Sequence, residues 1–154
     1  MEKIKKLSRV HVDIGFGDEL TESPRKDKMS SIISSFDPIS WKVYPFETIL
    51  AEKLETIFSR ASANSRAKDV CDLVLLFKRC ENQRQLRESI EATIETRGTS
   101  IPKSFFESAK KLDLGQLRVS WPGVQLGDRE SFDKYWQGLL GCLKELDFLF
   151  NKNN

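Results

Sequence analysis

The spacing of the apolar residues changes once along this chain, and this change restricts the fold more than any other feature. Residues 9–17 alternate apolar side chains with polar residues or glycine, a period of two that predicts a strand. A second short strand is predicted at residues 39–43, before Pro45. From Pro45 onward, apolar residues recur every three or four positions, as in amphipathic helices. Strands followed by helices predict an α+β fold.

The connection between the two strands, residues 17–38, is polar and proline-containing, which predicts a surface loop. Two strands alone make a sheet that is marginal in water and has two open edges, so either helices cover these edges or further strands are missing. The C-terminal half shows no internal repeat. Helices are predicted at residues 45–60, 64–79, 83–97 and 129–150, with a short helical segment after Pro102 and Asn64 or Ser65 as the cap of the second helix.

Composition narrows the class of protein. The 154 residues are 39% apolar and 31% charged with a net charge of +2, which suits one compact unit and argues against disorder. No apolar run approaches the ~20 residues of a membrane helix, and the first residues lack a signal-peptide core, so we expect a cytoplasmic protein. Three cysteines without zinc-site spacing are expected to be reduced and structural.

Lys53 falls inside the apolar stripe of the first predicted helix. Burying an ammonium group is costly unless it is paired or its stem snorkels to water. A lysine aimed at a cleft would suit a triphosphate, because its compact charge attracts phosphate oxygens. A snorkelling lysine at the end of the stripe is the alternative.

The second predicted helix opens with four charged residues at ion-pair spacing. Arg66 with Asp69 and Lys68 with Asp72 are three and four residues apart, which is typical of surface ion pairs. Asp69, however, adjoins the apolar face, so partial burial of its pair with Arg66 is expected. Such a pair could orient Lys53 or a metal-bound phosphate.

Asp13 is a carboxylate on the first predicted strand, followed by glycine two residues later. A strand-borne carboxylate of this kind can hold Mg²⁺, and a solvent-exposed face is the alternative. Glu145 and Asp147 mimic an acid-x-acid metal motif, but they lie in a predicted helix, where residues two apart point in different directions. We therefore expect them on a solvated face.

Three segments together resemble the AbiEii/AbiGii toxin family of nucleotidyltransferases: residues 12–18 (VDIGFGD), 44–55 (YPFETILAEKLE) and 64–73 (NSRAKDVCDL). The resemblance is strong over residues 9–80 and looser over the later helices. It implies a partial polymerase β-type nucleotidyltransferase core in residues 1–80, with a helical region, residues 81–154, packed on it. It also implies transfer of a nucleotide from an NTP to an acceptor, tRNA for some members, in a bacterial toxin–antitoxin setting.

The resemblance also implies roles for single residues. Lys53 matches the lysine expected to contact the nucleotide phosphates, and with Arg66 it would bind the nucleotide. Asp69 and Asp72 match the acidic pair of the last motif, of which Asp69 is favoured as the catalytic or lysine-orienting member. Asp13 resembles the third carboxylate of the polymerase-type metal site, where it would hold Mg²⁺.

The family's Gly-Ser helix start and Asp-x-Asp strand have no counterpart before Asp13. In-line phosphoryl transfer depends on metal-held geometry, so one of three carboxylates should not suffice. We therefore expect a truncated or split enzyme that is inactive alone and that needs an N-terminal half.

Two further hypotheses belong to other classes. A non-catalytic interaction module would form a homodimer or bind an antitoxin through its open sheet edge. An RNA-binding protein would use short basic clusters as phosphate contacts, with affinity that falls steeply with salt. Those clusters contain Lys3, Lys5, Lys6, Arg25, Lys26 and Lys28.

Overall fold

The structure, a computed structural model, describes residues 12, 14, 23–33, 35–124 and 131–151. Within them, two strands are followed by six α-helices and two single-turn 3₁₀ helices, which confirms the α+β class. The elements are β1 (Arg25–Met29), β2 (Ile39–Val43), α1 (Phe46–Arg60), η1 (Ala61–Ala63), α2 (Ala67–Arg79), α3 (Gln83–Thr96), α4 (Phe105–Lys110), α5 (Gly115–Ser120), η2 (Trp121–Gly123) and α6 (Phe132–Asn151).

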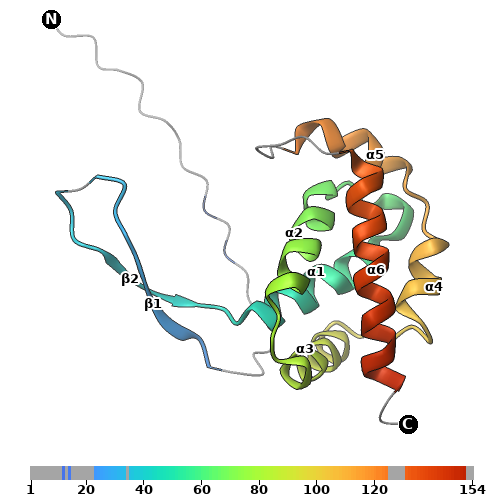
Figure 1. The fold of residues 1–154 in the computed structure, drawn as a ribbon, viewed down its shortest axis with the longest axis horizontal. Coiled ribbons are helices and arrows are strands. Elements are labelled where there is room, and N and C mark those ends of the chain that lie inside the picture. The colour runs from blue at the N-terminus through green and yellow to red at the C-terminus, as the bar shows by residue number, and fades with distance from the viewer. Residues whose placement is uncertain (1–11, 13, 15–22, 34, 125–130, 152–154) are drawn as a thin grey trace, which may run out of the picture.

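β1 and β2 pair antiparallel in a two-stranded hairpin that projects from the helices (Figure 1). The strand predicted at residues 39–43 is confirmed as β2. The prediction of a surface loop over residues 17–38 is wrong at residues 25–29, which form β1. The strand could not be recognised from the sequence, because all five of its residues are exposed and no apolar alternation marks it. A backbone ladder holds this segment as a strand without a buried face.

The strand predicted at residues 9–17 lies mostly outside the described residues. Of that stretch, the structure describes Val12 and Ile14, which belong to no strand and are 75% and 71% exposed. The predicted apolar face is therefore not buried at these two positions. Asp13 lies outside the described residues.

The first three predicted helices are confirmed with small shifts at their ends. Helix α1 begins directly after the buried Pro45, as the proline predicts. Neither Asn64 nor Ser65 caps α2: the Asn64 side-chain oxygen instead accepts a hydrogen bond from the Arg66 N–H at 2.9 Å, so this turn precedes the helix. Gly98 follows α3 with φ +62°, a conformation that favours glycine.

The short helix after Pro102 and the long last helix are also confirmed, as α4 and α6, whereas α5 was not predicted. The expectation that Glu145 and Asp147 share a solvated face is wrong for Asp147. Its carboxylate accepts hydrogen bonds from the Ser104 hydroxyl at 2.6 Å and the Phe105 N–H at 2.7 Å. Asp147 of α6 therefore caps the N-terminus of α4, where a negative charge is favourable.

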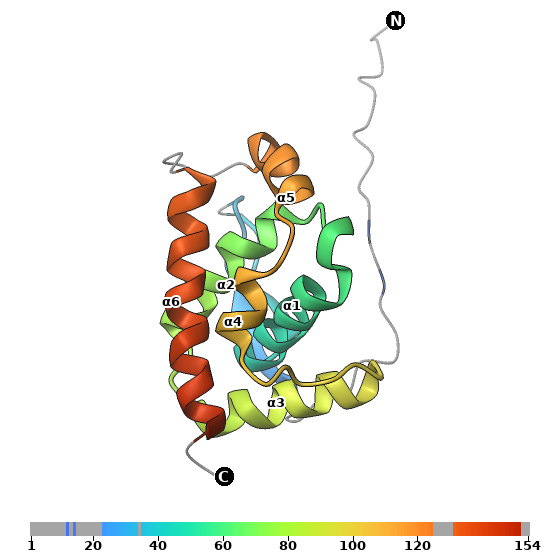
Figure 2. The same ribbon diagram turned by 90° about the vertical axis from the view of Figure 1, so that its right-hand side faces the viewer.

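The helices pack around α1 and α2. Helix α3 crosses beneath α1, while α6 runs along α2 and α4 (Figure 2). The buried core is continuous and draws residues from both sides of residue 80, including Leu54, Val70, Ile90 and Leu139. The division into residues 1–80 and 81–154 stays a prediction from the sequence. Among the described residues, none of the helices combines the length and apolarity that a membrane crossing requires.

Candidate functional site

Lys53 projects from the middle of α1 toward the start of α2, where two carboxylates receive it. Its Nζ lies 2.5 Å from Asp69 Oδ1 and 2.9 Å from Asp72 Oδ2. The lysine side chain is 20% exposed, whereas that of Asp69 is only 4% exposed. Lys53 is therefore paired rather than merely snorkelling, and its ammonium group is held at a fixed point between α1 and α2.

Arg66 completes the contacts of Asp69. Arg66 Nε donates to Asp69 Oδ2 at 2.7 Å, so both oxygens of this buried carboxylate are bonded to cations. The arginine side chain is 53% exposed, so Arg66 remains accessible from solvent while it holds Asp69. A buried carboxylate needs such partners, since burying a charge without them is costly.

Asp72 connects a second exposed cation to the cluster. Lys68 Nζ lies 3.5 Å from Asp72 Oδ2, the same oxygen that contacts Lys53. The four residues from α2 and its N-terminal turn therefore behave as predicted for their spacing, and the structure adds Lys53 from α1 to them. Lys53, Arg66 and Lys68 outnumber the two carboxylates, so the cluster carries a net positive charge.

The surroundings of Lys53 stabilise its charged form. Burial by itself would lower the pKa of Lys53, but hydrogen bonds to Asp69 and Asp72, together with their charges, outweigh burial and raise that pKa above its ordinary value. Lys53 is therefore a cation at neutral pH. It can neutralise an anion, but it is unsuited to act as a base.

An open pocket of about 530 Å³ lies over this cluster. All five charged residues of the cluster line it, together with Ser65 and Ala67. A further part of its wall comes from Ser120 at the end of α5, Gly123 in η2 and Val124 directly after η2. Sequence reasoning missed this wall, because α5 and η2 are too short to show a helical period.

The described part of the site suits an anion better than a metal ion. Among the described residues, no group of three or more His, Cys, Asp or Glu side chains could hold a metal. Asp69 and Asp72 are already bonded to cations, so this donor set does not fit Mg²⁺. Asp13, the predicted metal ligand, lies outside the described residues and is not placed near the pocket or away from it.

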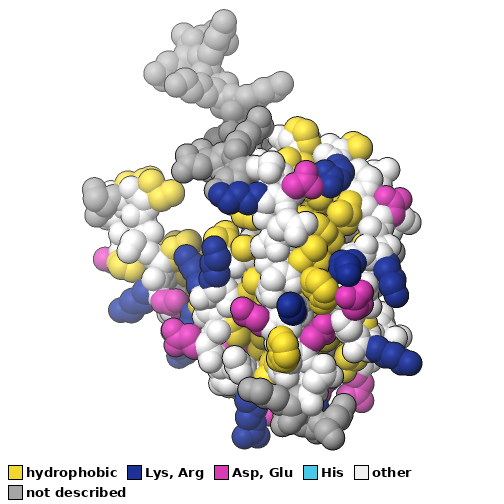
Figure 3. Space-filling view, turned by 45° about the vertical axis from the view of Figure 1, so that its right-hand side comes forward, with side chains coloured by type: hydrophobic (Ala, Val, Ile, Leu, Met, Phe, Trp, Pro, Cys, Tyr) yellow, Lys and Arg dark blue, Asp and Glu magenta, His cyan; other side chains and the backbone are white. Residues whose placement is uncertain are grey.

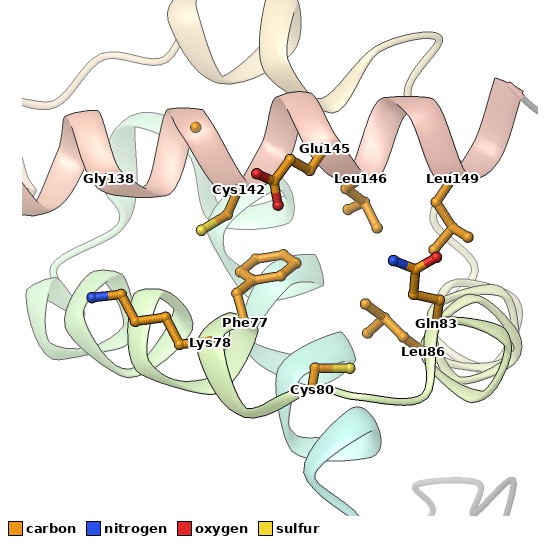
Figure 4. A pocket seen from close by; sticks show the side chains of 11 residues that line it. Phe77, Lys78, Cys80, Gln83, Leu86, Gly138, Cys142, Glu145, Leu146 and Leu149 are labelled. Atoms are coloured by element: carbon orange, nitrogen blue, oxygen red, sulfur yellow. The ribbon is translucent and has the colours of Figure 1, made fainter.

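A second cavity, of about 370 Å³, separates α6 from the end of α2 and the start of α3 (Figure 4). Leucine side chains and Phe77 line it, together with Cys80, which directly follows α2, and Cys142 of α6. Burial, followed by the nearby Glu47 charge, raises the pKa of Cys80 to about 11. The thiol is therefore protonated at neutral pH; that the cysteines are structural stays a prediction.

A family model described as nucleotidyl transferase AbiEii toxin, type IV toxin–antitoxin system, matches residues 4–139. The chain belongs to the AbiEii family. No curated protein and no solved structure matches it. The resemblance seen in the sequence is thus confirmed, and the match extends beyond residue 80 into the first half of α6.

AbiEii membership gives the cluster a chemical context. It indicates a nucleotidyltransferase-like function in a toxin–antitoxin system. The site residues predicted from the sequence, Lys53, Arg66, Asp69 and Asp72, lie in one pocket. Their roles in an AbiEii enzyme stay predictions, and so does that of Asp13.

Proposed function

We propose that the pocket over Lys53 binds the phosphates of an NTP and forms the phosphate-binding part of a nucleotidyltransferase site. The observation that carries this proposal is the convergence of three cations, Lys53, Arg66 and Lys68, on one open pocket. The pocket has a net positive charge although two carboxylates lie within it. A polyphosphate is the ligand that this charge favours.

Each cation retains donors for a phosphate. An ammonium group has three protons, and the contacts with Asp69 and Asp72 use two of those on Lys53. The terminal nitrogens of Arg66 make no hydrogen bond to the described residues, so they can bind a phosphate in the bidentate manner. Asp69 acts here as the positioning residue, since it holds both Lys53 and Arg66.

The acceptor and the metal belong to the same proposal. The description of the family as a toxin supports an antitoxin partner. An RNA acceptor such as tRNA is proposed from the resemblance of the sequence alone. Mg²⁺ at Asp13 is proposed from the sequence alone, and no step of the reaction is derived through it. The 154 residues contain no Asp-x-Asp pair. We therefore propose that this polypeptide transfers no nucleotide by itself and acts with carboxylates supplied by an N-terminal half.

Calorimetric titration with tripolyphosphate, and then with each NTP in the presence of Mg²⁺, tests the pocket. Wild type should bind, and Arg66→Ala should weaken binding about tenfold, the effect of one lost charged hydrogen bond. Lys53→Ala should abolish binding. Lys111→Ala, at an exposed lysine outside the pocket, is the matched control and should bind as wild type does.

Arg66 is more than half exposed, so Arg66→Ala keeps the test valid if Lys53→Ala fails to fold. Binding that neither variant weakens would overturn the assignment of the pocket, and a folded wild type that binds no polyphosphate would overturn the proposed function. Transfer of label from an α-labelled NTP to RNA by the purified chain, lost in Asp13→Ala, would contradict the proposed inactivity.

The hairpin favours a second candidate function, a non-catalytic interaction module. Trp41, Met29 and Ile39 are about half exposed on a two-stranded sheet, and such a sheet is marginal without a covering partner. A second copy of the chain or an antitoxin would cover this face. This candidate predicts a dimer by light scattering and no effect of Lys53→Ala on association.

A further inference from the structure

The register of the hairpin separates its charged side chains onto two faces. Residues directly opposite each other in an antiparallel pair lie on the same face. Lys26 lies opposite Lys42, and Lys28 lies opposite Ser40. Because Lys26 and Lys28 are two positions apart on one strand, all four residues share a face. We name Lys26, Lys28 and Lys42 the lysine face.

The remaining charged residues of β1 lie on the other face. Arg25 is opposite Val43, and Asp27 is opposite Trp41. The Arg25 guanidinium stacks over the Phe46 ring at 5.1 Å, so this cation is engaged with the start of α1. The basic run read from the sequence is therefore divided: Arg25 leaves it, and Lys42 from the other strand joins it.

The lysine face is an unfavourable arrangement for the hairpin alone. Lys26 and Lys42 lie directly opposite each other, where Cβ atoms are typically about 5 Å apart, and like charges in this position destabilise a strand pair. The single acidic residue of the two strands, Asp27, lies on the opposite face. All three lysines are exposed, and none forms an ion pair within the described part of the chain. The hairpin projects beyond the helical body, which consists of α1 to α6 (Figure 1). Figure 3 shows Lys and Arg side chains at the surface on this side of the molecule.

We propose that the lysine face binds the phosphate backbone of a nucleic-acid acceptor, with RNA as the class of ligand. Three adjacent cations without an acid on their face complement a polyanion, and phosphates attract lysine without regard to sequence. The choice of RNA over an acidic protein rests on the proposed nucleotidyltransferase function. The same hairpin would thus hold the acceptor while the Lys53 pocket holds the donor nucleotide.

Fluorescence anisotropy with a short labelled single-stranded RNA tests the lysine face on the full chain in the absence of NTP. The combined variant Lys26→Gln, Lys28→Gln and Lys42→Gln should reduce the slope of log affinity against log salt by about two, since each phosphate contact contributes about 0.7. This change in slope corresponds to a loss of RNA affinity on the order of 100-fold near 0.1 M salt, and the loss should vanish near 1 M salt.

Two matched variants control for folding and for net charge. The triple Lys→Arg variant at the same positions keeps the charges and should bind RNA as wild type does. The triple variant Lys103→Gln, Lys111→Gln and Lys144→Gln removes three exposed lysines of the helical body and should retain most of the affinity and salt slope. Circular dichroism verifies that each variant is folded.

The two triple glutamine variants distinguish binding at the lysine face from a response to net charge. Equal losses in the hairpin triple and the body triple would overturn the proposal, since RNA would then respond only to net charge. Competition by polyglutamate as effective as by unlabelled RNA would also overturn it, in favour of an acidic protein partner. Tripolyphosphate binding measured on the hairpin triple should be unchanged, so a failure here is distinguishable from a failure of the Lys53 pocket.

Discussion

The helical body and the hairpin differ in what holds them together. In the body, core side chains such as Leu50, Leu139 and Leu143 have no exposed surface. Burial of such apolar side chains favours the folded state. In the hairpin, all five residues of β1 are exposed, and only Val43 of β2 is half-buried. Side chains of the body are therefore constrained by packing, whereas most of those of the hairpin are exposed and accessible to a partner; Arg25, stacked over Phe46, is an exception.

The candidate site belongs to the body. Lys53 lies on α1 and Asp69 on α2, two helices that pack directly against each other. The ion pairs of the site are consequently formed without the hairpin, and a phosphate would meet donors already in place. The hairpin, in contrast, offers charge and apolar surface on an open two-stranded sheet.

A pair of truncations should give the largest difference between the two regions. Leu143→Ala removes a fully buried side chain of α6 and should cost about 2–5 kcal/mol of unfolding free energy. Ile39→Ala, in the hairpin, should change it by less than about 0.5 kcal/mol. Urea denaturation measures both. A large cost for Ile39→Ala that grows with protein concentration would show that the hairpin is buried in an oligomer.

Two lysines provide the next contrast. Lys53→Met should destabilise the body by on the order of 3 kcal/mol, because it leaves the buried Asp69 with Arg66 as its remaining cation. Lys42→Met, in the hairpin, should stay within about 0.5 kcal/mol of wild type. The same denaturation series measures both variants. A stability of Lys53→Met equal to that of wild type would mean that the ion pairs of Lys53 add nothing to the fold.

Two acidic residues of α6 allow a comparison within the body between a carboxylate that caps a helix and one that is exposed. Asp147→Asn should cost about 1 kcal/mol, because the N–H groups of α4 lose a charged acceptor. Glu145→Gln, two residues away and exposed, should leave the stability unchanged. Thermal melting of both variants compares them directly. Equal effects would show that the contact seen at α4 carries no free energy.

Periodicity predicted the body well, because each long helix buries one stripe of apolar side chains. Lys53, within such a stripe, and Asp69, beside another, were recognisable as charges that burial would force to pair. What periodicity could not provide is that Lys53 and Asp69 meet, since sixteen residues separate them and the crossing of α1 and α2 brings them together. The residues suggested only that the Arg66–Asp69 pair could orient Lys53, and the family resemblance favoured Asp69 as the catalytic or lysine-orienting residue.

Of the two strands of the hairpin, β2 was predicted, whereas β1 was not, for the reason that sets the hairpin apart from the body. The sequence of β1, Arg-Lys-Asp-Lys-Met, buries nothing, so its two faces differ in charge rather than in polarity. Asp147 escaped prediction for a related reason. Its partner, the start of α4, lies more than forty residues earlier in the chain, and a helical pattern records the face of a residue but not its neighbour.

The smallest expected effect concerns thiol reactivity, which we compare between a cysteine of the body and one introduced into the hairpin. Burial, with the Glu47 charge, raises the pKa of Cys80 to about 11, against about 8.5 for a free thiol. Because the folded state holds this proton more tightly, the resulting stability is present below about pH 8.5 and is lost as the pH rises toward about 11.

At about pH 8, Cys80 should react with iodoacetamide at least about tenfold more slowly than the thiol of a Ser40→Cys hairpin variant. Mass spectrometry of the two peptides measures the rates. Equal rates at this pH would show that the region around Cys80 opens as readily as the hairpin, and the contrast between the two regions would then hold for packing but not for dynamics.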